Sequence, residues 1–101
     1  MKGIKLAEPK QIECVELEKP VPGPGEALIR IVAAGICGSD VNAFRGINPL
    51  VSYPRIIGHE LAGIIEEIPD DNPKGLKAGD KVIIDPYIYC GKCYKGTWRT
   101  Y

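Results

Sequence analysis

The chain has 101 residues, with 13 basic and 13 acidic side chains, one His and four Cys. This length allows one domain with a modest core and excludes a core plus a second, cofactor-holding domain. The zero net charge gives no electrostatic basis for binding nucleic acid, and the longest apolar run, Ile31 to Cys37, is too short to cross a bilayer.

The composition favours strands. Ile and Val account for 20 residues against six Leu, and Gly and Pro account for 21. Branching at Cβ suits a pleated sheet better than a helix, and frequent Gly and Pro indicate many turns. The sequence therefore predicts a mainly-β domain.

Two strands are expected in the first part of the chain, over residues 3–7 and 11–18. The alternation of the second strand slips between Cys14 and Val15, which is compatible with a β-bulge. Cys14 belongs to no motif, and we expect it in the core. The Pro- and Gly-rich segment 20–25 excludes a strand or a helix.

The clearest strand is expected over residues 26–36, where every second residue from Ala27 to Ala33 is apolar. One short helix is expected over 39–44, capped by Ser39 or Asp40 and ended by Gly46. Residues 47–55 hold two prolines and are expected to be irregular. Two further strands are expected, over 59–68 and 81–85.

The residues after the clearest strand could hold a metal. Cys37 lies at the strand end, where a ligand would be held rigidly, although buried structural Cys is the commoner role. His59 is the only imidazole and adjoins the carboxylate of Glu60. Thiolate, imidazole and carboxylate form a donor set that suits Zn²⁺, and a catalytic zinc requires three protein ligands. Cys37, His59 and Glu60 supply that number.

A second thiol pair, Cys90 and Cys93, has the CxxC spacing of a metal site or a redox pair. No Cys or His follows it in residues 94–101, so a four-ligand structural zinc site is incomplete in sequence. A thioredoxin-like role requires a helix beginning at the first Cys, and the residues after Cys93 do not favour one.

Four motifs follow one another along the chain: Cys37-Gly38-Ser39-Asp40, Gly58-His59-Glu60, Gly79-Asp80-Lys81-Val82 and Cys90-Gly91-Lys92-Cys93. In this order and spacing they resemble the N-terminal, GroES-like catalytic domain of the zinc-dependent medium-chain alcohol dehydrogenase family. The sorbitol, threonine and butanediol dehydrogenase branch is the most similar. The resemblance implies a partly open β-barrel with one short helix, over residues 1–93, followed by an atypical tail over 94–101.

The resemblance also implies roles for individual residues. Cys37 and His59 match catalytic zinc ligands, and Glu60 matches a residue that binds this zinc in the sorbitol dehydrogenase branch. Ser39 matches the hydroxyl that passes the substrate proton towards solvent, and Asp40 matches a carboxylate that orients the ligand His. Cys90 and Cys93 match the first two of four cysteines around a structural zinc.

The implied reaction is hydride transfer between the carbon of a small alcohol or polyol and NAD(P), with zinc polarising the oxygen. The sequence departs from the family at two positions, since Gly96 stands where another Cys is usual and Asn42 stands where His often completes the proton relay. No GxGxxG occurs, so the 101 residues lack the family's Rossmann domain and a cofactor-binding motif. We therefore expect partial zinc binding and no catalysis by this chain alone, with NAD(P) bound only in a full-length parent.

Three further expectations concern the chain as a whole. The residues from Met1 to Leu6 lack the apolar segment of a signal peptide, which predicts a cytoplasmic protein with reduced thiols. A domain without the rest of its parent is expected to expose apolar surface and to self-associate. Two alternative functions stay open: a non-catalytic GroES-like binding or interaction module, and a small metal or redox module built on the CxxC.

Overall fold

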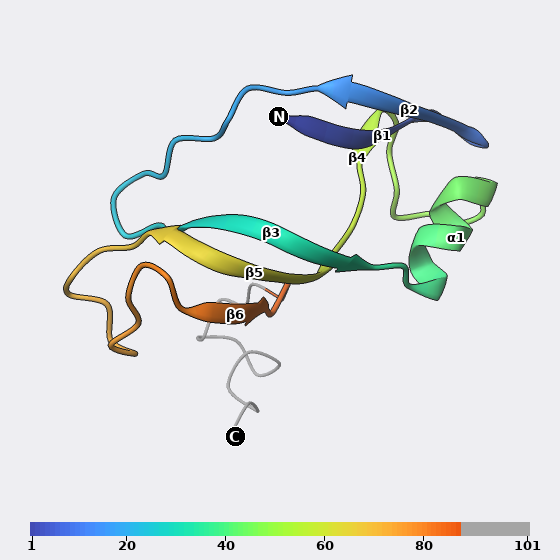
Figure 1. Cartoon of the computed structure of the whole chain (residues 1–101). Helices are drawn as coiled ribbons and strands as arrows, with labels where there is room; N and C mark the ends of the chain where they lie inside the picture. The colour runs from blue at the N-terminus through green and yellow to red at the C-terminus, as the bar shows by residue number, and fades with distance from the viewer. Residues whose placement is uncertain (88–101) are drawn as a thin grey trace.

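The computed structural model describes residues 1–87. The elements are β1 (Lys2–Glu8), β2 (Gln11–Glu16), β3 (Leu28–Gly35), α1 (Gly38–Arg45), β4 (Arg55–Ile56), β5 (Glu60–Glu67) and β6 (Lys81–Ile84). The strands form two three-stranded antiparallel sheets, with strand orders β2-β1-β4 and β3-β5-β6, and α1 is the one short helix of the described residues (Figure 1). The predicted mainly-β class with one short helix is confirmed. Within residues 1–87 no helix is long and apolar enough to span a membrane.

The register and the exposure of β2 in the first sheet differ from what its local sequence pattern predicts. Gly3 and Ile4 pair in unbroken register with Val15 and Cys14, and the only shift between β1 and β2 lies between Leu6 and Glu8. The expected bulge at Cys14 is therefore wrong. Cys14 is also exposed rather than in the core, because β2 is an edge strand of which only one residue is partly covered.

The expectation that residues 47–55 are irregular is wrong at its last residue. Arg55 and Ile56 form β4, which pairs with Leu6 and Lys5 at the centre of β1. The strand has two residues and its partner lies about fifty positions earlier in the chain. No local pattern indicates a pairing of this kind.

The core of the described residues is thin and takes one buried apolar side chain from each of four elements. Leu6, Leu28, Ala43 and Ile65 are buried, and they come from β1, β3, α1 and β5. Leu6 is the one large side chain among them that is completely buried. Of the apolar face expected on the clearest strand, only Ile29 is partly covered, and Ile31 remains 44% exposed.

The helix begins earlier than expected. Its N-cap is Cys37 rather than Ser39 or Asp40, and the Asp40 carboxylate accepts a hydrogen bond of 2.9 Å from the Cys37 N–H. The predicted end at Gly46 is confirmed by a left-handed φ of 75°. A Cβ at Gly46 would also lie only 2.8 Å from the Cβ of Pro9, so the helix ends tightly against the turn between β1 and β2.

Candidate metal centre

The pairing of β3 with β5 brings two distant motifs to one place. Gly35 at the end of β3 is the partner of Glu60 at the start of β5. Cys37 follows β3 by two residues, and His59 immediately precedes β5. Because the strands are antiparallel, the end of one meets the beginning of the other. The register therefore places Cys37 and His59 together, although 21 residues lie between them in the sequence.

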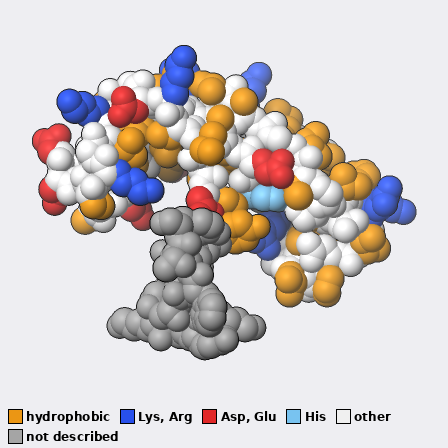
Figure 2. Space-filling view, turned by 90° about the horizontal axis from the view of Figure 1, so that it is seen from below, with side chains coloured by type: hydrophobic (Ala, Val, Ile, Leu, Met, Phe, Trp, Pro, Cys, Tyr) orange, Lys and Arg blue, Asp and Glu red, His pale blue; other side chains and the backbone are white. Residues whose placement is uncertain are grey.

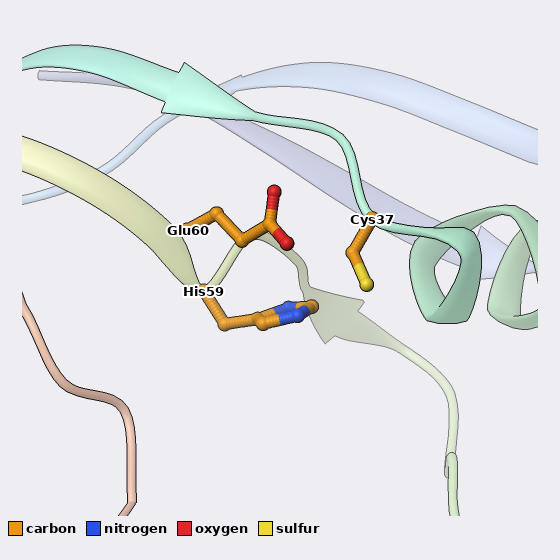
Figure 3. A group of neighbouring side chains, drawn as sticks. All are labelled: Cys37, His59 and Glu60. Carbon is orange, nitrogen blue, oxygen red and sulfur yellow. The ribbon is translucent and has the colours of Figure 1, made fainter.

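The side chains of Cys37, His59 and Glu60 point towards one another (Figure 3). One ligand atom from each, a sulfur, a ring nitrogen and a carboxylate oxygen, lies within 4.8 Å of the other two. Some point therefore lies within about 2.8 Å of all three atoms, against about 2.0–2.3 Å for bonds to zinc. The donor set and its spacing fit Zn²⁺ after a small inward movement.

Two glycines make this convergence possible. A Cβ at Gly35 would lie 2.6 Å from Glu60 Oε2 and 3.1 Å from Glu60 Cβ, so the Glu60 side chain occupies space that any other residue would fill. Gly58 has a φ of 109°, which L side chains rarely adopt, and it directs the chain into His59. The motif Gly58-His59-Glu60 thus requires glycine at position 58 because of the positive φ of that residue.

Asp40 connects the helix to the imidazole. One carboxylate oxygen accepts the hydrogen bond from the Cys37 N–H, and the other lies 3.5 Å from His59 Nδ1. The Asp40 side chain is only 13% exposed, whereas that of His59 is 34% exposed. A carboxylate at Nδ1 leaves Nε2 as the ring nitrogen for a metal. Asp40 therefore orients two of the three candidate ligands.

The Cys37 thiol and the His59 imidazole shift each other's pKa. Hydrogen bonds with the side chain and backbone of Ser39, followed by one with His59, lower the pKa of the Cys37 thiol against the opposing effects of burial and the Glu60 charge. The hydrogen bond with Cys37 raises the pKa of His59, and the charge of Asp40 raises it further against the effect of burial. A thiolate is the form of Cys that binds metals.

A cavity of about 500 Å³ opens beside the imidazole. Ser39, Asp40 and His59 line it, together with Asn48, Arg55 and Tyr87, which the sequence analysis did not single out. These three come from an irregular connection, a two-residue strand and the segment after β6, so only the folded chain brings them together. In Figure 2 the imidazole, in pale blue, reaches the surface beside an acidic side chain.

The predicted site residues thus divide into two groups. Cys37, Ser39, Asp40, His59 and Glu60 lie together at the junction of β3, α1 and β5. The predicted structural zinc ligands, Cys90 and Cys93, lie outside the described residues.

Comparison with known proteins defines the class. The alcohol dehydrogenase GroES-like domain family matches residues 23–100. The chain therefore belongs to the alcohol dehydrogenase family, and the observed strands and helix are those of its GroES-like domain.

Individual relatives extend over most of the chain. An uncharacterised zinc-type alcohol dehydrogenase-like protein of Haemophilus influenzae is 45% identical over 93% of this chain and 28% of its own length. The L-galactonate-5-dehydrogenase of Escherichia coli is 43% identical over 85% of this chain and 25% of its own length. A crystal structure of an alcohol dehydrogenase from E. coli CFT073 with NADH has a TM-score of 0.82 and 39% identity, over 96% of this chain and 28% of that one. The chain thus spans about a quarter of the length of these relatives.

Proposed function

We propose that this chain carries the zinc-binding part of the catalytic domain of a zinc-dependent, NAD(P)-linked alcohol or polyol dehydrogenase. The convergence of Cys37, His59 and Glu60 beside a cavity carries the proposal. A bare interaction module needs no thiolate, imidazole and carboxylate at one point. The family of the chain and the NADH bound to one of its structural relatives support the same reaction class.

Each residue around the cluster has a distinct task. A zinc ion held there would supply a Lewis acid for polarising the oxygen of an alcohol. Cys37, His59 and Glu60 would hold the ion, and Asp40 keeps the imidazole in its ligand orientation. Ser39 lines the cavity at the first turn of α1, where its hydroxyl can accept the alcohol proton and donate its own towards solvent.

The remaining parts of the reaction need more chain than these 101 residues. Hydride transfer requires the nicotinamide and the substrate carbon to be held at roughly 3–3.5 Å, and no GxGxxG motif is present to bind the cofactor. We therefore assign NAD(P) to a full-length parent, which we place in the cytoplasm. We propose a small alcohol or polyol as the substrate; the substrate named for the L-galactonate-5-dehydrogenase relative carries several alcohol groups together with a carboxylate.

Zinc content after extensive dialysis tests the metal assignment. We expect partial zinc in the purified chain and its loss in the double variant Cys37→Ala, His59→Ala. Cys14→Ala is the matched control, because Cys14 is an exposed thiol outside the cluster. Stoichiometric zinc that survives the double substitution would contradict the proposal.

An assay of turnover by the isolated chain tests whether these 101 residues alone lack catalytic activity. We expect no NAD(P)H formation from a panel of polyols and secondary alcohols, because the sequence contains no GxGxxG motif to hold the hydride acceptor. Turnover that scales with chain concentration and survives Cys37→Ala would show that the assigned roles are misplaced.

A further inference from the structure

The cavity beside His59 is lined by a cationic residue, Arg55, that has no partner among the described residues. Its charged or titratable lining residues are Asp40, Arg55, His59 and Tyr87. Arg55 is the permanent cation among them, because a guanidinium keeps its proton throughout the physiological range. Its side chain forms no ion pair or hydrogen bond with any residue in 1–87.

Among residues 1–87, the one carboxylate that lines the cavity already has partners. Asp40 accepts a hydrogen bond from the Cys37 N–H and lies 3.5 Å from the imidazole of His59. It is also the less exposed partner of that pair, at 13%. Asp40 forms no ion pair with Arg55, so within residues 1–87 no carboxylate engages the guanidinium.

The backbone of Arg55 is held in place by the core of the first sheet. Arg55 is the β4 partner of Leu6, the large side chain that is completely buried. Because this pairing fixes the backbone of β4, the Arg55 side chain extends from a fixed position in the cavity wall. Asn48 also lines the cavity, and its Oδ1 accepts a hydrogen bond from the Leu50 N–H, which leaves the amide NH₂ able to donate to a hydroxyl.

We propose that Arg55 selects substrates that carry a carboxylate in addition to the reacting alcohol, such as sugar acids and hydroxy acids. The planar guanidinium offers paired N–H donors that match the two oxygens of a carboxylate, whereas a neutral polyol offers no counter-charge. One end of the substrate would then lie at Arg55 and a hydroxyl would lie towards Ser39 and His59. This role rests on the proposed function, because Arg55 can select a substrate only if the site acts on an alcohol. It adds to that function the class of substrate.

Ligand titration followed by NMR tests the selection with matched pairs. D-Gluconate and D-glucitol differ only at one terminal carbon, a carboxylate in the first and a primary alcohol in the second, and L-galactonate and galactitol form a second pair. We expect the 101-residue chain to bind at least one of the acids about fivefold more tightly than its polyol. Arg55→Met should abolish the difference and Arg55→Lys should retain part of it. Arg45→Met should leave it unchanged, because Arg45 lies in the last turn of α1 and does not line the cavity.

Measurement with and without zinc separates the two proposals. The preference should persist in the zinc-free chain, because Arg55 is not a metal ligand. If the unsubstituted chain binds no zinc but keeps an Arg55-dependent preference for acids, the metal assignment alone is overturned. Acids and polyols bound equally, or a preference that survives Arg55→Met, would overturn the role of Arg55 while leaving the metal assignment intact.

Discussion

Asp40 is the residue on which the other functional side chains depend. It holds the N-terminus of α1 through the Cys37 N–H and faces the imidazole of His59. Asp40→Asn should preserve the hydrogen bond to Cys37, because an amide oxygen still accepts, but it removes the negative charge beside His59. We expect zinc affinity to fall by about tenfold or more, as is usual when the partner of a ligand His is lost. Competition with a chromophoric chelator measures the change, and an unaltered affinity in a folded variant would contradict this role.

The protonation of His59 predicts the pH dependence of zinc binding. The pKa of His59 is raised in the zinc-free chain, mainly by the hydrogen bond with Cys37, and zinc requires the neutral imidazole. Protons therefore compete with zinc already above the ordinary His pKa of about 6.5. The pKa of Cys37 is lowered, so the thiol contributes less to this competition. Zinc affinity should fall as the pH decreases through the raised pKa of His59. A chelator titration at successive pH values checks this, and a flat profile across neutrality would be inconsistent with it.

At the scale of elements, the junction of β3 and β5 positions the cluster. Gly35 faces Glu60 across the two strands and leaves room for its side chain. Gly35→Ala should push the Glu60 carboxylate away from Cys37 and His59, because the added Cβ would lie 2.6 Å from Glu60 Oε2. We expect weaker zinc binding with the sheet retained by circular dichroism. Gly38→Ala is the control, since a Cβ there meets no atom within 4 Å. Equal zinc affinity in the two variants would argue against this reason for the glycine.

At the scale of the whole molecule, apolar side chains remain uncovered on the second sheet. Val32 on β3 and Ile83 on β6 are 55% and 87% exposed, and both line a shallow groove across that sheet. Strand β6 is also an edge strand of the sheet within the described residues. Exposed apolar surface next to an open edge favours pairing, and we propose that a second copy of the chain covers it.

Sedimentation velocity over a range of concentrations tests this self-association. Ile83→Lys should shift the distribution towards the monomer without unfolding the chain, since so exposed a side chain contributes little to the core. Val21→Lys should have no such effect, because Val21 is equally exposed, at 89%, but lies outside both sheets. A wild-type chain that stays monomeric at high concentration would rule out the proposal.

The sequence by itself determined the class of fold and the identity of the candidate ligands. β-Branched residues and frequent Gly and Pro specify short strands, and this preference is local, so it can be read from the composition. Gly46 ends the helix for a local reason as well, because its left-handed φ favours glycine. Cys37, His59 and Glu60 could be singled out because zinc requires their donor atoms, whatever the fold.

Only the tertiary structure decided how these residues meet and what surrounds them. The register that pairs Gly35 with Glu60 and the position of Arg55 opposite Leu6 both join segments far apart in the chain. Local periodicity carries no information on such pairings, since it shows which residues alternate but not which strand lies beside them. The same limitation placed Cys14 in the core, although it is exposed on an edge strand. Burial and the composition of the cavity depend on the packing of distant elements, and they appear only when the chain has folded.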